Sequence, residues 1–208
     1  MMTEKVEDPA ADIAWMRRLA EEGGQAPLQG ASIGFAAGLL YGAASVAHWA
    51  IVSRVLPLDY SFITWVWLGA TALFFIVLIA VLRHLKRTEL VVTSANRASG
   101  TAWAAVGWGI FALSVSVMVL GWRLGEEAIM VGFALVPSMV MVFYASGWAV
   151  SAAMKRSRMM WTLALASFAA APLLAALTGM DEQYLAYAAA LFLLMALPNW
   201  LLMRAARG

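Results

Sequence analysis

Residues 60–82 read YSFITWVWLGATALFFIVLIAVL, an uninterrupted run of 23 residues without a charged side chain. At 1.5 Å rise per residue, an α-helix of this length extends about 35 Å, which exceeds the roughly 30 Å hydrocarbon core of a bilayer. A transmembrane barrel strand needs only about ten residues of alternating polarity, so this run is too long and too uniformly apolar for one. The stretch therefore predicts a transmembrane helix.

Five further stretches resemble it, and all 26 formally charged side chains fall outside the six. Backbone groups in lipid must pair within their own segment, which favours helices. Three of the connecting loops have only about five residues, so consecutive helices are expected to be antiparallel neighbours. The sequence predicts an all-α, polytopic integral membrane protein, with six transmembrane helices in an antiparallel bundle. The predicted spans are residues 29–53, 60–82, 98–122, 128–153, 159–178 and 184–203.

The basic residues alternate between connecting segments, and this alternation predicts the orientation. Twelve of the fourteen lie in the N-terminal segment, the second and fourth loops and the C-terminal tail, whereas the opposite side has only Arg54 and Arg123. Lys and Arg near short loops stay in the cytoplasm. Both termini are therefore predicted to be cytoplasmic. The predominance of Arg over Lys and the abundance of Ala favour a bacterial inner (plasma) membrane.

The N-terminal segment, residues 1–27, is predicted to be separate from the six-helix transmembrane domain, residues 28–208. Asp8-Pro9 is typical of a helix start, and the following residues form an amphipathic pattern that ends at Gly23-Gly24. Trp15, Met16 and Leu19 share its apolar face. Two interpretations stay open: a helix lying along the membrane or its own bundle, and a docking surface for a protein partner.

Four glycines, Gly30, Gly34, Gly38 and Gly42, recur every fourth residue along the first predicted span. Small residues at this spacing form a flat stripe along which helices approach closely, a pattern known as a glycine zipper. The stripe predicts tight helix packing. Packing within the chain, a homo-oligomer seam and a ligand-facing stripe are all compatible with it.

Few residues suggest chemistry inside the membrane. His48 is the only titratable group well inside a predicted span, and His84 lies near the other side of the membrane, so the two cannot ligate one haem. No nucleophile has both a base and an orienting acid, no metal-binding motif occurs, and cysteine is absent. The sequence predicts no cofactor, no metal site and no catalytic group. Most aromatic residues are assigned to interfacial belts or packing; the candidates for a cavity or gate are His48, Trp65, Trp108, Pro137 and Pro172.

No family motif is recognised in the chain. The sequence favours a small, non-enzymatic membrane protein with a structural, sensory or accessory role. Its expected contacts are membrane lipid, a protein partner at the cytoplasmic face and a homo-oligomer, with no nucleic acid. The alternative hypothesis is a small transporter or channel for a neutral or apolar solute, because the interior of the spans lacks the charges that ion-coupled transporters use.

Overall fold

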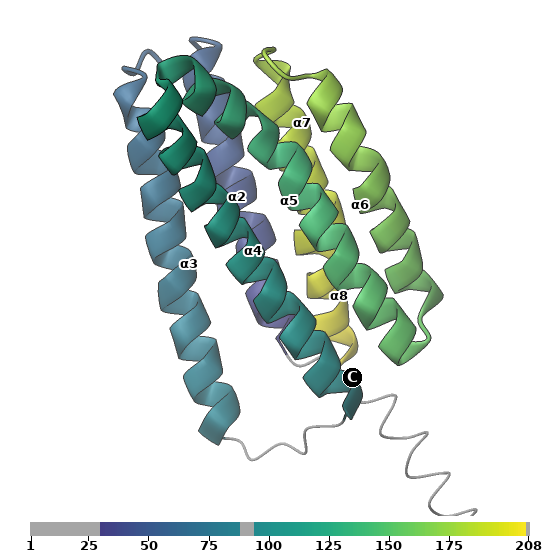
Figure 1. The fold of residues 1–208 in the computed structure, drawn as a ribbon. Helices are drawn as coiled ribbons and strands as arrows, with labels where there is room; N and C mark the ends of the chain where they lie inside the picture. Colours follow the sequence, from purple (N-terminus) through teal and green to yellow (C-terminus); the bar gives the residue numbers. More distant parts are fainter. Residues whose placement is uncertain (1–29, 88–93, 207–208) are drawn as a thin grey trace, which may run out of the picture.

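The computed structural model describes residues 30–87 and 94–206, and within these ranges the chain contains helices and no strand. The last of six spans is composite, because a short π-helix interrupts it. Figure 1 shows these elements: α2 (Ala31–Val52), α3 (Ser61–Arg87), α4 (Ser94–Leu124), α5 (Glu126–Lys155), α6 (Arg158–Ala176), α7 (Glu182–Leu191), η1 (Phe192–Ala196) and α8 (Leu197–Ala205).

Six helices in this part of the chain are long and apolar enough to cross a membrane, with Glu182–Ala205 counted as one span. The chain is a multipass membrane protein. The amphipathic helix predicted near the N terminus, with Trp15, Met16 and Leu19, lies outside the described residues.

Several helices extend beyond the apolar runs that predicted them. α3 continues to Arg87 and α4 begins at Ser94, because a helix can extend past the hydrocarbon core where charged side chains are hydrated. Basic side chains in the last turn of α3 also favour this end of the helix dipole. The connection between α4 and α5 is shorter than predicted, since Gly125 alone separates them. Its φ of 95° is a conformation that glycine adopts without a Cβ clash.

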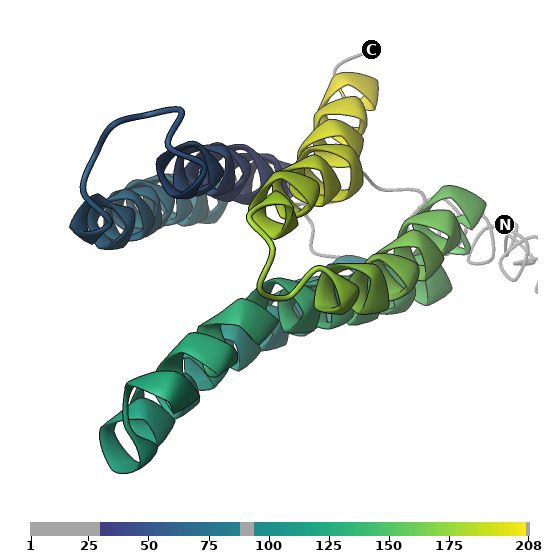
Figure 2. The ribbon, with the colours of Figure 1, turned by 90° about the horizontal axis from the view of Figure 1, so that it is seen from above.

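The six spans form two layers of three. In the first layer, α2 packs against α3 and along α7, η1 and α8; in the second, α5 packs against both α4 and α6. Figure 2 shows the two groups from above, and they meet where α6 lies beside α7 and η1. α2 is thus the central helix of the first layer, and α5 is the central helix of the second.

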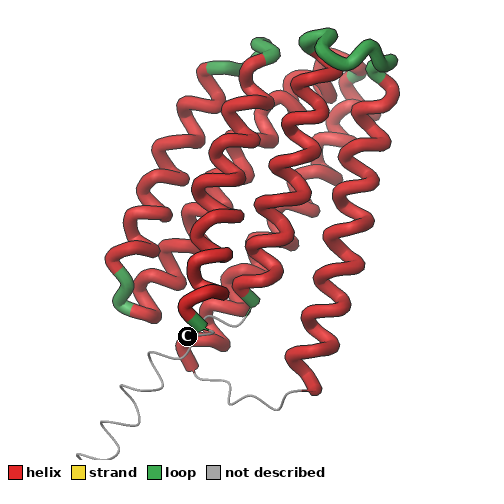
Figure 3. Tube along the Cα trace, turned by 180° about the vertical axis from the view of Figure 1, so that it is seen from behind, coloured by secondary structure: helices red, strands yellow, loops and turns green. Residues whose placement is uncertain are grey.

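Charged residues mark the two ends of the molecule, which Figure 3 shows with the loops in green. We call the end with Arg204 and the 156–157 loop the basic end. Its members are Arg83, Lys86, Arg87, Arg97, Lys155, Arg156, Arg158 and Arg204. The other, acidic end has all five described carboxylates: Asp59, Glu126, Glu127, Asp181 and Glu182.

One carboxylate at the acidic end helps to begin a helix. Asp59 Oδ1 accepts a hydrogen bond from the backbone N–H of Ser61 at 2.8 Å. A carboxylate in this position satisfies an otherwise unpaired N–H of the first turn. The same bond to Ser61 holds the pKa of Asp59 below its usual value, with a smaller contribution from Arg54.

The glycine stripe of α2 faces the last span of the same chain. A Cβ on Gly34 would lie 2.6 Å from the Asn199 side chain, and one on Gly42 would lie 2.5 Å from the Phe192 ring. A Cβ on Gly38 would meet the backbone nitrogen of Ala196. Gly30 lies just before the helix, with a φ of 98°. Three of the four glycines therefore permit close contact between α2 and the η1–α8 region.

α3 and α4 are much less enclosed than α2. α3 has one buried residue, Ala70, and large side chains such as Phe75 and Ile76 are more than half exposed along it. Such apolar surfaces are suited to contact with lipid. The two peripheral helices therefore offer most of their length to the surrounding membrane.

We predict that Gly38→Ala destabilises the protein by about 1–3 kcal/mol, because the added methyl group meets backbone that cannot move aside. Gly69→Ala is the matched control, since a Cβ there has no atom within 4 Å. Its expected effect is neutral or stabilising, because alanine favours helix more than glycine does. Unfolding in mild detergent would measure both. Equal stabilities, with loss of an oligomer only in Gly38→Ala, would instead show that the stripe joins two chains.

Candidate functional site

The most enclosed region is the core between the two layers. Apolar and aromatic side chains from both layers fill it, and we call this set the interlayer core. Its buried members are Val106, Val140, Met141, Tyr144, Trp148, Ala152, Met160, Ala164, Ala171, Leu174, Tyr187, Leu191 and Met195.

Three tyrosines from three spans come together here: Tyr41 of α2, Tyr144 of α5 and Tyr187 of α7. Tyr144 is 6% exposed and Tyr187 is 4% exposed, and Tyr41 packs against the same core. The Tyr41 hydroxyl donates to Thr71 Oγ1 at 3.4 Å. For Tyr144 and Tyr187, no hydroxyl hydrogen bond is found with any residue in 30–87 or 94–206, so both groups have hydrogen-bonding capacity to offer a small polar molecule.

Aromatic rings pack against Tyr41 and Tyr144. The Trp67 ring stacks near Tyr41 at a centroid distance of 6.3 Å. The Trp103 ring lies 6.0 Å from Tyr144 and 5.2 Å from Trp148, and its Nε1–H donates to Ser151 Oγ at 3.1 Å. The described interlayer core is therefore uncharged and rich in aromatic rings.

The last span is irregular where it meets this core. Pro198 has no N–H, so the carbonyl of Leu194, four residues earlier, loses its usual helical partner. Trp148 Nε1–H donates to that carbonyl at 3.1 Å. The next carbonyl, that of Met195, accepts from Asn199 Nδ2 at 2.8 Å. The Trp148 side chain, which belongs to the second layer, thus takes the place of the main-chain hydrogen bond that Pro198 cannot donate in the first layer.

Gln183 connects the layers nearer the acidic end. It is 1% exposed, and its Nε2 donates to the carbonyl of Ala134 at 2.7 Å and to that of Leu174 at 3.1 Å. These carbonyls belong to α5 and to the last turns of α6, while Gln183 itself lies in α7. One amide therefore joins three helices.

His48 belongs to an aromatic group toward the acidic end, which shares Trp67 with Tyr41. Trp67 Nε1–H donates to His48 Nδ1 at 3.0 Å, and the His48 ring stacks on Tyr184 with centroids 3.5 Å apart. Because Nδ1 accepts, the bond is made by the neutral tautomer with its proton on Nε2. This group joins α2, α3 and α7.

The sequence-derived candidates are placed in different environments. Trp65 and Trp108 lie on the outer surface, 69% and 71% exposed, and Pro172 is also exposed. Pro137 is buried in α5, close to Ala134. The structure does not bring these four residues together with His48 in one site.

Ionisable groups offer little chemistry within the spans. Among the described residues, no three His, Cys, Asp or Glu side chains are grouped so that they could hold a metal ion. Among the buried serines, Ser45 donates to the Tyr184 carbonyl at 2.7 Å and Ser151 to the Gly147 carbonyl at 2.9 Å. The buried hydroxyls of Ser99 and Ser167 have no hydrogen-bond partner among the described residues.

Sequence reasoning missed Gln183, Asn199 and the tyrosine cluster. A signal for the first two was present, because an amide inside an apolar run is costly in lipid unless it finds a partner. The tyrosines carried no comparable signal, since Tyr is frequent at membrane boundaries.

Comparison with known proteins gives no family assignment: no protein-family model, no curated protein and no solved structure matches the chain.

We predict that Trp148→Phe lowers stability by about 1–3 kcal/mol, because it leaves the Leu194 carbonyl unpaired in an apolar core. In a Pro198→Ala background the cost is expected to fall, since the substituted residue can supply its own backbone N–H to that carbonyl. Unfolding free energies of the single and double variants form a double-mutant cycle. Equal costs of Trp148→Phe in both backgrounds would contradict this account.

Proposed function

We propose that this protein is a non-enzymatic accessory protein of a bacterial inner membrane, which acts by binding a protein partner. The observation that carries the proposal is the contrast between the hydrogen-bonded interior and the exposed helices α3 and α4. Polar side chains of the interior join one helix to another, within a layer or between the layers, whereas α3 and α4 have few buried residues. Such an arrangement suits a rigid scaffold with accessible sides and ends.

The interior contacts support the scaffold part of the proposal. Trp148, Gln183, Ser45 and Ser138 each donate to a main-chain carbonyl of another helix. Bonds of this kind hold helices in one register and leave fewer polar groups for a substrate.

The charge distribution supports the orientation part. The described basic end has eight Lys and Arg residues, and the positive-inside rule assigns such an end to the cytoplasm. On this proposal the spans cross the membrane in alternating directions, and both termini are cytoplasmic. The N-terminal segment, with six acids against three bases, then lies beside the basic end, where its Trp15, Met16 and Leu19 face can bind the partner.

We expect deletion of residues 1–24 to leave membrane insertion and thermal stability unchanged but to abolish a stoichiometric complex with the partner. Native mass spectrometry of the protein extracted from its host in mild detergent would measure the complex. The matched control is the full chain with Lys5→Gln, which preserves the apolar face. A complex of unchanged stoichiometry after the deletion would exclude the N-terminal segment as the docking surface.

A second candidate function, passage of a small neutral solute, is favoured by the tyrosine cluster. The hydroxyls of Tyr144 and Tyr187 lie between the layers beside an irregular span, and π-helical segments are frequent at functional sites. Because no carboxylate, Lys, Arg or His is among the described residues of the interlayer core, a neutral solute is the chemical class that fits.

On this second candidate, Tyr144→Phe and Tyr187→Phe are expected to lower glycerol flux into proteoliposomes at least severalfold, because each removes a hydroxyl from the interior. Shrinkage and reswelling followed by light scattering would measure the flux. Tyr60→Phe is the control, since Tyr60 is exposed at the acidic end. Flux equal to that of protein-free vesicles for the unmodified protein would exclude glycerol passage.

A further inference from the structure

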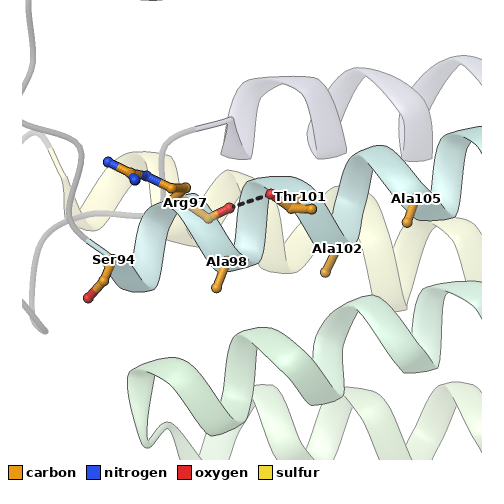
Figure 4. A pocket seen from close by; sticks show the side chains of 6 residues that line it. All are labelled: Ser94, Arg97, Ala98, Thr101, Ala102 and Ala105. Atoms are coloured by element: carbon orange, nitrogen blue, oxygen red, sulfur yellow. Dashed lines mark hydrogen bonds between the residues drawn. The ribbon is translucent and has the colours of Figure 1, made fainter.

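The hydrogen bonds of the two exposed helices, α3 and α4, differ in what they join. Figure 4 shows the start of α4, where Thr101 donates to the Arg97 carbonyl of its own helix at 3.0 Å. On α3, Trp67 Nε1–H donates instead to His48 Nδ1 of α2, also at 3.0 Å. The Trp67 bond therefore connects two spans, and it lies in the half of α3 that is nearer the acidic end.

α3 is attached to the rest of the fold by few contacts. It packs against α2 and has one buried residue, Ala70. Among the described residues, the other side-chain hydrogen bond between these two helices is that from the Tyr41 hydroxyl to Thr71 Oγ1, at 3.4 Å. Thr71 lies one turn further from the acidic end than Trp67 does. The bond to His48 is thus the shorter of the two and the one nearer the acidic end.

Trp67 can make this bond only to a neutral His48. An indole nitrogen donates and cannot accept, and imidazole Nδ1 accepts only while it carries no proton. Protonation places an N–H on both nitrogens of the imidazole, so two donors would then face each other. Proton uptake by His48 and its bond to α3 therefore exclude one another.

The contact of His48 with α7 depends on charge in a different way. The His48 ring stacks on Tyr184, with centroids 3.5 Å apart and planes inclined by 25°. The face of a tyrosine ring attracts a cation, so this stack also accommodates an imidazolium. Ser45, one turn earlier in α2, donates to the Tyr184 carbonyl at 2.7 Å and does not titrate. Protonation thus removes the hydrogen bond to α3 and leaves both contacts with α7.

Water lies close enough to His48 to supply the proton. The side chain is half-buried, and it lies four residues before the end of α2 at Val52, which corresponds to about 6 Å along the helix. No charged group among the described residues pairs with the imidazole. The titratable groups of the surrounding elements at this end are Tyr41 and Tyr184 near the ring and, at the exposed ends of the helices, Arg54, Asp59, Tyr60, Asp181 and Glu182.

We propose that the contact between His48 and Trp67 is proton-sensitive: neutral His48 holds the acidic-end half of α3 against α2, and protonated His48 releases it while remaining stacked on Tyr184. A fall in pH at the acidic end is thereby converted into movement of one span. This inference is independent of the accessory function proposed above.

Nuclear magnetic resonance of the full chain in lipid nanodiscs, with its tryptophans isotopically labelled, tests the proposal. The indole N–H signal of Trp67, identified by its loss in Trp67→Phe, is expected to move upfield between about pH 8 and about pH 4, because the N–H loses its acceptor. His48→Gln should abolish this movement, since an amide does not titrate. His84→Gln is the matched control: it replaces the other histidine, in the last turn of α3, and should leave the Trp67 response unchanged.

Movement of α3 is measured separately, by pulsed electron paramagnetic resonance between two nitroxide labels. The chain has no cysteine, so Phe62→Cys on α3 and Met180→Cys before α7 place the labels at two exposed positions. The distance between them is expected to lengthen at the low-pH limit of the titration. Trp67→Phe, which removes the donor, should make this distance independent of pH. The pair Leu39→Cys and Met180→Cys reports α2 instead and should give one distance throughout.

Three results would overturn the proposal. An unchanged Trp67 signal throughout the titration would show that His48 keeps its bond and takes up no proton. An equal shift in His48→Gln would assign the response to the carboxylates of the acidic end, such as Asp59, which bonds to Ser61 at the start of α3. A shifted Trp67 signal with an unchanged distance between the labels at positions 62 and 180 would show that the bond is lost without release of α3.

Discussion

The requirement that every main-chain polar group be paired in an apolar solvent governs this structure. An unpaired carbonyl in hydrocarbon costs several kcal/mol, and no water is present to compensate. Regular helices meet the requirement by themselves, so irregular points need help from side chains. At Pro198 the help comes across the layer boundary, where the Trp148 indole bonds to the Leu194 carbonyl. The same bond that satisfies the backbone therefore also joins the two layers.

Packing between spans follows from a second property of lipid. A large apolar side chain gains little by leaving lipid for a protein core, so helices associate through close contact of small residues and through hydrogen bonds. α2 illustrates this, because its buried residues are mostly Gly, Ala and Ser. Gly38 approaches the backbone of Ala196, whereas large residues of α3 such as Phe75 remain exposed. Small residues thus identify helix contacts in this chain better than hydrophobicity does.

This property also explains how far the sequence could predict the structure. Hydropathy located all six spans, because a change from water to hydrocarbon leaves a strong signal in charge and length. It could not show which side of a span faces the core. Trp65 and Trp67 are two residues apart and equally apolar, yet Trp65 is 69% exposed while Trp67 donates a hydrogen bond to His48. In a soluble helix the polar face would separate them; here lipid and core are both apolar, so the periodicity disappears. The π-helix and the tyrosine cluster were unpredictable for the same reason, since each depends on which helices become neighbours.

Function in such a protein is expected where a residue departs from these two rules. The interior amides, Gln183 and Asn199, follow them, because each donates to main-chain carbonyls of the described helices. The hydroxyls of Ser99 and Ser167 depart from this pattern of pairing, since they are buried without a hydrogen bond to any described residue.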